Sequence, residues 1–249
     1  MTFRKLHYQA HPLLICIVWD AASARMAEEL NFQAIGTSSG AIAAMLGYQD
    51  GEEISFEELY IVLNGIAKHT RLPWSVDLEA GYDEDISGIL QHINRLIDLG
   101  ISGINLEDSR VSTERKLRNA ESFSSTIEQI KRQHPSLFLN VRTDTYLLRH
   151  PLALQETKRR AQLYEKAGGD GIFIPGLVKE EDIKEVVAST NLPVNVMCFA
   201  GLPDFMLLHA WGIKRISMGD FAFRVMYQQF REKLADLKQQ QSFNTILPS

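Results

Sequence analysis

The stretch RLPWSVDLEAGYDED, residues 71–85, begins as a short apolar run and then fills with acidic side chains. Five carboxylates fall within nine residues: Asp77, Glu79, Asp83, Glu84 and Asp85. Because side chains of a β-strand alternate between its faces, Asp77 and Glu79 are predicted to share one face. The last three acids lie where a helix is expected to begin, and negative charge stabilises a helix N-terminus. Asp77 and Glu79 are therefore the candidates for chemistry.

The same order of strand and helix continues on both sides of this stretch. Within residues 86–97, six apolar side chains recur at helical spacing, and Gly100 follows as a stop signal. Eight strand-like runs cover residues 13–19, 33–38, 73–78, 102–108, 137–144, 171–176, 192–198 and 214–219, each followed by a helical pattern. This alternation predicts an α/β fold, a (β/α)8 TIM-type barrel, with an open doubly wound sheet as the alternative.

Length and composition agree with one soluble barrel. The 249 residues contain no repeat or linker, so residues 1–249 are expected to form a single domain, with 221–249 as its terminal helix and tail. A net charge of −5 argues against nucleic-acid or anionic-membrane partners, and no run approaches the ~20 apolar residues of a membrane span. Cys16 and Cys198 lie in or at the ends of apolar runs, which predicts buried free thiols in a cytoplasmic protein.

Active-site residues of such barrels lie at the C-terminal ends of the strands. In this sequence those ends carry Trp19, Asp20, Ser38, Ser39, Gly40, Asp77, Glu79, Glu107, Asp108, Arg142 and Asp144. Carboxylates that converge in one place repel one another unless a cation shares them. Oxygen ligands without His or Cys favour Mg²⁺ or Mn²⁺ over zinc. Asp77, Glu79 and Glu107 are therefore the predicted metal ligands, with helix capping or pairing to arginine as their structural alternative.

Two further features of these strand ends suit an anionic substrate. The guanidinium of Arg142 could bind a carboxylate or phosphonate in bidentate fashion, although an ion pair with Asp144 or Glu107 is its structural alternative. The segment GTSSGAIAAMLG, residues 36–47, places small residues between a strand and a short helix. Backbone N–H groups at such a turn can bind an oxyanion.

Six segments together carry a family resemblance. They are VWDAASAR (18–25), GTSSGAIAAMLGYQDG (36–51), SVDLEAGY (75–82), GINLEDS (103–109), NVRTD (140–144) and GGDGIFIPG (168–176). In this order and spacing they resemble the phosphoenolpyruvate mutase/isocitrate lyase superfamily over residues 13–220. The resemblance implies Mg²⁺-dependent chemistry on 2-oxo acids. It also implies a homodimer or homotetramer in which the terminal helix is exchanged between subunits.

The resemblance assigns a role to individual positions of this sequence. Asp77 corresponds to the direct metal ligand, whereas Glu79 and Glu107 correspond to ligands that act through water. Asp50 corresponds to an aspartate beside the reacting group, and Arg142 to the arginine that binds the distal anion; these two are the expected catalytic residues. The expected substrate-binding residues are Trp19, Asp20, Ser38, Ser39, Gly40 and Arg142.

The sequence departs from the family's pattern at two places. Lyases of the superfamily carry a Lys-Lys/Arg-Cys-Gly-His loop whose cysteine acts as acid and base, and mutases and hydrolases carry Pro-Lys-Thr-Asn-Ser. Here the loop reads SRVSTERKLRN, residues 109–119. Pro175 stands where the mutase has histidine and lyases have glutamate. The loop instead offers Arg110, Arg115, Lys116 and Arg118, which suit closure over a second anionic group.

The leading interpretation is a Mg²⁺-dependent enzyme that cleaves or rearranges a P–C or C–C bond of a small 2-oxo acid. Metal chelation by the carboxylate and carbonyl of a phosphonopyruvate- or oxaloacetate-like acid would stabilise the enolate formed. One alternative is a C–C lyase of the methylisocitrate type, in which Tyr48 or Lys116 replaces the missing cysteine. Another is a barrel that binds a metal–oxoacid complex without turnover.

Overall fold

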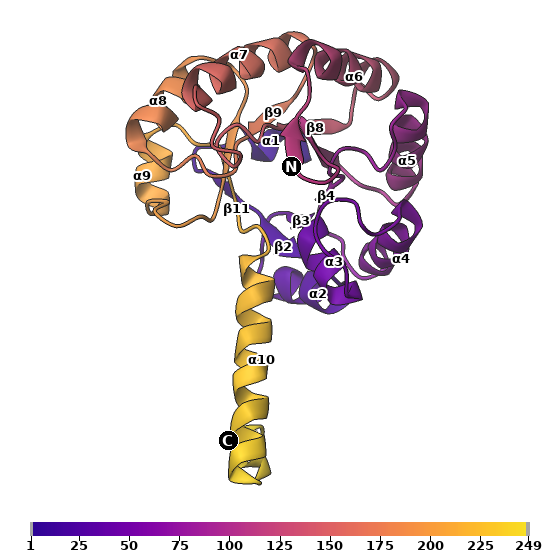
Figure 1. The fold of residues 1–249 in the computed structure, drawn as a ribbon, viewed down its shortest axis with the longest axis vertical. Coiled ribbons are helices and arrows are strands. Elements are labelled where there is room, and N and C mark those ends of the chain that lie inside the picture. The colour runs from indigo at the N-terminus through magenta and orange to yellow at the C-terminus, as the bar shows by residue number, and fades with distance from the viewer. Residues whose placement is uncertain (1, 248–249) are drawn as a thin grey trace.

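The computed structural model describes residues 2–247 and shows the predicted barrel (Figure 1). One sheet of nine parallel strands forms its wall. In chain order the strands are β1 (Leu13–Leu14), β2 (Cys16–Val18), β3 (Ile35–Thr37), β4 (Trp74–Asp77), β5 (Gly103–Glu107), β8 (Phe138–Arg142), β9 (Gly171–Phe173), β10 (Val194–Met197) and β11 (Arg215–Ser217). Their order in the sheet is β1-β11-β10-β9-β8-β5-β4-β3-β2.

The first predicted strand, residues 13–19, closes the barrel by dividing between two neighbours. Its first part, β1, pairs with β11, and its second part, β2, pairs with β3. At the junction, Ile15 N donates to Ile216 O at 3.0 Å, and Cys16 N donates to Ala34 O at 3.3 Å. One extended segment thus joins both edges of the sheet, which confirms the TIM-type barrel over the open sheet.

Amphipathic helices form a ring outside the strands (Figure 1). They are α2 (Ala21–Glu29), α3 (Ser39–Leu46), α4 (Phe56–Ala67), α5 (Ile86–Asp98), α6 (Ala120–Gln133), α7 (Ala153–Lys166), α8 (Glu180–Ala188) and α9 (Phe205–Ala210). In α5, the residues that pack on the sheet are Ile89, Ile93 and Leu96, which recur at helical spacing. Side-chain caps fix several helix starts, such as Ser55 with Glu58 at the start of α4.

Polar side chains occupy alternate positions of the strands inside the barrel. Asn140 Nδ2 donates to Asn105 Oδ1 at 2.8 Å and to Asn195 Oδ1 at 3.1 Å. The guanidinium of Arg215, which is fully buried, donates to Ser75 Oγ at 3.2 Å and to Asn105 Oδ1 at 3.4 Å. These hydrogen bonds connect the strands inside the barrel and so support the strand ends that carry the predicted site.

The short helix α1 (Phe3–Leu6) was not predicted, and it lies within the ring at the N-terminal end of the strands (Figure 1). Phe3 and Leu6 join Phe138 in a small apolar cluster. His7, which follows the helix, stacks on the Phe138 ring with their centroids 4.0 Å apart. These side chains cover the end of the barrel opposite the predicted site.

Residues 109–117 form a hairpin that was expected to be a loop. Its strands, β6 (Ser109–Val111) and β7 (Arg115–Leu117), pair in antiparallel fashion directly after β5. The hairpin therefore begins at the C-terminal end of the barrel, beside the predicted metal ligands.

The terminal helix α10 (Phe221–Gln240) extends away from the barrel (Figure 1). Its buried residue, Phe223, packs against Trp19 with the ring centroids 5.3 Å apart. Other apolar side chains of α10 are exposed, among them Val225, Phe230 and Leu234. A short 3₁₀ helix, η1 (Phe243–Thr245), follows. Residues 248 and 249 of the predicted tail, and residue 1, lie outside the described residues.

The prediction of two buried thiols is wrong. Cys198 is exposed in the segment after β10. Cys16 is only partly buried: it lies on the opposite face of the strand from Ile15 and Ile17 and packs against the edge of the main apolar core. No helix within residues 2–247 has both the length and the apolar character needed to cross a membrane.

Candidate active site

A cavity of about 690 Å³ opens at the C-terminal ends of the strands. Predicted site residues in its wall are Ser38, Ser39, Gly40, Asp50, Asp77 and Arg142, joined by Asn105, Tyr48, Phe173 and Met197. The structure thus brings together side chains from five strands and from the first turn of α3. A second cavity, of about 640 Å³, lies at the opposite end, where its Arg4 and Asp170 form an ion pair with each other.

Asp77 is the last residue of β4, and three donors hold its carboxylate. Ser39 donates to Oδ2 through its backbone N at 3.3 Å and through its hydroxyl at 2.7 Å. Asn105 Nδ2 donates to Oδ1 at 3.4 Å. Ser38 is the N-cap of α3, because its side chain accepts from Ala41 N. Ser39 is therefore the first helical residue and can donate to Asp77. The carboxylate is therefore fixed at the cavity wall by the helix start and by the neighbouring strand.

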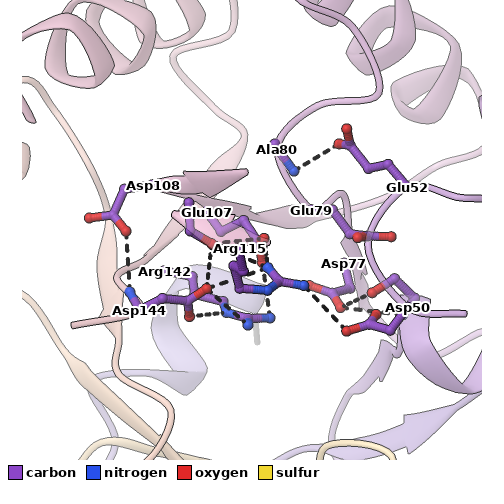
Figure 2. A network of polar contacts seen from close by, with 12 residues as sticks. Asp50, Glu52, Asp77, Glu79, Ala80, Glu107, Asp108, Arg115, Arg142 and Asp144 are labelled. Atoms are coloured by element: carbon purple, nitrogen blue, oxygen red, sulfur yellow. Dashed lines mark hydrogen bonds and ion pairs between the residues drawn. The ribbon is translucent and has the colours of Figure 1, made fainter. Parts of the chain in front are cut away.

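Glu79 lies near Asp77, but the strand-period argument for it is wrong. β4 ends at Asp77, and Glu79 has a positive φ of 48°, so it belongs to a turn rather than to the strand. Glu52 fixes this turn, because its Oε1 accepts from the backbone N of Ala80 at 2.9 Å and of Tyr82 at 2.8 Å. Figure 2 shows that the turn places the Glu79 side chain on the same side as Asp77.

The Glu79 carboxyl is buried beside other acids. Burial, and secondly the negative charge of Asp50, raise the pKa of Glu79 to about 9. The Tyr82 hydroxyl donates to its Oε1 at 2.6 Å. Its Oε2 has no hydrogen-bond partner within the described residues. A buried carboxylate oxygen without a donor fits a site that holds a cation.

Glu107 and Arg142 are register partners at the ends of β5 and β8. Arg142 Nη1 lies 3.0 Å from Glu107 Oε2, and its Nε donates to Asp144 Oδ1 at 2.7 Å. The structural alternative for Arg142, pairing with these two acids, is therefore present, although Arg142 also lines the cavity. Burial raises the pKa of the Glu107 carboxyl, and the charge of Arg142 opposes that rise.

Arg115, on β7, reaches the same acids from the hairpin (Figure 2). Its Nη1 contacts Glu107 Oε1 and lies 3.4 Å from Asp144 Oδ2, while its Nη2 lies 3.3 Å from Asp50 Oδ2. Lys116 instead pairs with Glu114 at the surface, and 68% of its side chain is exposed. Closure of the basic residues of this segment over an anionic group stays a prediction. Arg115 points toward the acids of the site and Lys116 points away from them, since alternate residues of a strand point to opposite sides.

Asp50 lies in the segment between α3 and α4, next to the start of α3. A Cβ atom on Gly40 would lie 3.0 Å from Asp50 Oδ1, so a larger residue at position 40 would displace the carboxylate. Half of the Asp50 side chain is exposed; burial of the remainder and the charge of Asp77 raise its pKa.

Trp19 and Asp20 lie outside the cavity wall. The Asp20 carboxylate forms a capping box with Ser23 at the start of α2, and Trp19 packs on Phe223. Their role in substrate binding stays a prediction. Asn105 was missed, although it precedes Glu107 by two residues and so shares its face of β5. Asp144 was named among the strand ends and as a possible partner of Arg142, but it was not assigned a site role; it lies two residues beyond β8.

The residues fit a hard cation with one direct protein ligand. Within residues 2–247, no three His, Cys, Asp or Glu side chains gather closely enough to form a complete metal site. Asp77 lines the cavity, whereas Glu79 and Glu107 are not part of its lining; Glu79 Oε2 has no hydrogen-bond partner within the described residues. One direct carboxylate, with further acids acting through water, is a common arrangement for Mg²⁺.

Sequence comparison relates this arrangement to known proteins. A sequence model of the family described as phosphoenolpyruvate phosphomutase matches residues 3–238. The chain belongs to this family. The resemblance carried by the six segments is thereby confirmed.

Three proteins that are similar to this chain differ in the activity that their names give. A crystal structure from Burkholderia cenocepacia, assigned as a phosphonomutase, is 36% identical with a TM-score of 0.86, over 95% of this chain and 97% of the other. An oxaloacetate decarboxylase of Bradyrhizobium diazoefficiens is 30% identical over 71% of this chain and 63% of the other. Phosphonopyruvate hydrolase, solved with oxalate and Mg²⁺, shares the fold at 21% identity, with a TM-score of 0.89 over 100% and 92% of the two chains.

Proposed function

We propose that this protein is a Mg²⁺-dependent enzyme that cleaves or rearranges a P–C or C–C bond of a small 2-oxo acid through an enolate. The substrate is phosphonopyruvate- or oxaloacetate-like. The observation that carries this proposal is the shared cavity: Asp77, the first turn of α3 and Arg142 line one wall at the C-terminal ends of the strands. One small molecule in this cavity could therefore contact a cation held by Asp77, the N–H group that binds its oxygen atoms, and the Arg142 guanidinium, which binds its second anionic group.

Asp77 would hold the ion directly, with Glu79 and Glu107 acting through water. Bound Mg²⁺ supplies Lewis-acid stabilisation of the enolate oxygen. Mn²⁺ suits the same oxygen donors. The hydrogen bonds from Ser39 and Asn105 restrict rotation of the Asp77 carboxylate. Its two oxygen atoms are thus held in one orientation in which they could bind the ion.

The start of α3 would bind the pyruvyl oxygens. N–H groups in the first turn of a helix have no backbone partner within that helix, and they carry its partial positive charge. Side chains already accept from Ser39 N and Ala41 N, so Gly40 N is the N–H group of this turn that would bind the substrate. Ser38 and Gly40 line the cavity at this turn. The turn would orient the carboxylate and carbonyl of the 2-oxo acid while C3 faces away from it.

Arg142 would bind the anionic group on C3, and Asp50 would exchange a proton with C3. When the bond from C3 to that group breaks, its electron pair enters the enolate. A carboxylate would leave as CO₂, and a phosphonate would pass to water or, in a rearrangement, to the enolate oxygen. After loss of the group, protonation of C3 yields pyruvate. A carboxyl whose pKa is raised by burial and by a neighbouring acid is better matched to this proton exchange than an ordinary aspartate.

The lyase alternative has less support. Segment 109–119 contains no cysteine, and the two substitutes are poorly placed. The Tyr48 hydroxyl donates to Glu58 Oε1 at 2.8 Å, and Lys116 lies at the surface. The similarity to an oxaloacetate decarboxylase, and the oxalate and Mg²⁺ bound by the hydrolase of the same fold, instead favour a small 2-oxo acid.

A substrate screen with Mg²⁺ tests this choice. Oxaloacetate and phosphonopyruvate are expected to turn over, whereas isocitrate and 2-methylisocitrate are expected to remain uncleaved. Efficient cleavage of either isocitrate would contradict the proposal. Stabilisation of the fold by oxalate and Mg²⁺ without turnover of any acid would support a binding protein instead.

We also propose that the protein is a homodimer or homotetramer in which α10 packs on a neighbouring subunit. The helix carries exposed Val225, Phe230 and Leu234 along a segment that its own barrel does not cover. Exposed apolar side chains gathered on one element indicate an interaction surface. The length of α10, 20 residues, allows it to reach a second barrel.

A further inference from the structure

Hairpin β6–β7 is attached to the acidic cluster through one charged side chain. The Arg115 guanidinium contacts Glu107, Asp144 and Asp50, which come from three different parts of the chain. It also lies 3.2 Å from Ser109 Oγ at the base of the hairpin. Figure 2 shows the guanidinium extending from Glu107 toward Asp50, next to Asp77.

The other basic residues of the hairpin make no comparable contact. Lys116 pairs with exposed Glu114, and Arg110 lies 3.5 Å from Glu84, which is 93% exposed. At the base of the hairpin, Ser109 Oγ donates to Glu107 Oε1 at 3.2 Å and to Asp144 Oδ2 at 2.5 Å. A further link is apolar: a Cβ on Gly51 would lie 2.7 Å from Val111 Cγ2, so the hairpin packs tightly on the segment that carries Asp50. Arg115 is thus the cation that joins the hairpin to Glu107 and Asp50.

We propose that Arg115 is an internal counter-ion that competes with the divalent cation for the acidic cluster, so that metal binding loosens hairpin β6–β7. This inference rests on the proposed metal site at Asp77. Glu107 and Asp50 flank that site, and Arg115 neutralises both of them. A divalent ion there would repel the guanidinium and would draw the same carboxylates toward its water ligands.

The competition couples the ion to the entrance of the cavity. Without the Arg115 contacts, the hairpin keeps the hydrogen bonds of Ser109 at its base, the contact of Arg110 with Asp83 O and the packing of Val111. The second strand, β7, then has only its short ladder with β6 to hold it. Few contacts and a short ladder give a segment a low free energy of opening. Metal binding would therefore release the hairpin from the acidic cluster and open the cavity to an anionic substrate. The Arg115 guanidinium, no longer paired with the acids, would attract that substrate.

Mn²⁺ binding to the full-length protein, followed by electron paramagnetic resonance without substrate, tests the competition. Removal of the competing charge in Arg115→Gln is expected to tighten Mn²⁺ binding about tenfold, because a charge at this range in a partly buried site contributes energies of that order. Lys116→Gln removes the same charge from the neighbouring position and is expected to leave the affinity unchanged. Circular dichroism confirms that each variant is folded.

Amide hydrogen exchange tests the coupling. In the wild-type protein, Mn²⁺ is expected to speed exchange within residues 109–117; in Arg115→Gln, exchange there is expected to be fast with or without the ion. Equal or weaker Mn²⁺ binding by Arg115→Gln, or a hairpin that Mn²⁺ protects, would overturn the inference while leaving the metal site intact. Absence of Mn²⁺ binding by the wild-type protein and by both variants would instead refute the metal site itself.

Discussion

Ser39 Oγ donates a 2.7 Å hydrogen bond to Asp77 Oδ2, which joins the first turn of α3 to the end of β4. The turn expected to bind substrate and the carboxylate expected to bind the metal are thus parts of one arrangement. The bond fixes the Asp77 carboxylate relative to the N–H groups of the turn. Several measurable consequences depend on this link and on its neighbours.

Ser39→Ala is expected to weaken metal-dependent binding of oxalate, a mimic of the enolate of pyruvate. Loss of one hydrogen bond to a charged acceptor costs about 1.5–3 kcal/mol, or roughly 10- to 100-fold in affinity. Isothermal titration calorimetry with oxalate, with and without Mg²⁺, measures this change. Unchanged oxalate affinity would show that Ser39 does not organise the site.

Arg142→Lys is expected to lower kcat/KM for the 2-oxo acid on the order of 100-fold, because lysine cannot reproduce a bidentate contact with an anion. The ion pairs of Arg142 with Glu107 and Asp144 predict some loss of stability as well. Steady-state kinetics and urea denaturation of the same variant separate the two effects. A variant that loses stability but keeps wild-type kinetics would make Arg142 a structural residue only.

The stability of the fold is expected to fall in acid partly because of His7. Burial, and secondly the charge of Arg215, lower the pKa of His7 to about 3, and its Nδ1 donates to Phe3 O at 3.0 Å. Below pH 6.5 His7 binds a proton in the unfolded chain but not in the folded chain. The free energy of unfolding therefore decreases as the pH falls. One such group contributes a loss of about 2 kcal/mol between pH 7 and pH 5.

Urea denaturation of His7→Gln between pH 5 and pH 8 measures that contribution. The variant is expected to show a flatter pH dependence than the wild-type protein, whatever its stability at pH 8. His11→Gln, which alters an exposed histidine of the same segment, serves as the control and should keep the wild-type slope. Equal slopes for all three proteins would rule out a buried neutral His7.

Phe230→Asp is expected to shift the protein toward the monomer, because the aspartate would be buried without a partner when α10 packs on a second subunit. Analytical ultracentrifugation across a range of protein concentrations measures the distribution. Gln229→Asp places the same charge on the neighbouring exposed residue and is the matched control. A wild-type protein that is monomeric at all concentrations would refute helix exchange.

The repeated order of strand and helix predicted the barrel because each element carries its own periodicity. The division of residues 13–19 between two neighbours was not predictable, since pairing depends on which strands meet when the barrel closes. Hairpin β6–β7 was also missed, because its short polar strands have no apolar alternation. It is stabilised by contacts of Arg115 and Val111 that are distant in the sequence.

Within the site, the positions of the side chains that end β4, β5 and β8 could be predicted, but the way in which Glu79 reaches them could not. Asp77, Glu107 and Arg142 lie where the strand ends placed them. Glu79 reaches the cluster through a left-handed turn fixed by Glu52, a contact that no local pattern encodes.

The most direct test of the proposed function is nuclear magnetic resonance of reaction mixtures that contain Mg²⁺ and either oxaloacetate or phosphonopyruvate. Asp77→Ala at the same Mg²⁺ concentration corrects for spontaneous and metal-catalysed decarboxylation in solution. The account predicts that the wild-type protein forms pyruvate or phosphoenolpyruvate from at least one acid far faster than Asp77→Ala, and that removal of Mg²⁺ abolishes the difference. Equal product formation by the two proteins, or a wild-type activity that survives complete removal of divalent metal, would contradict it.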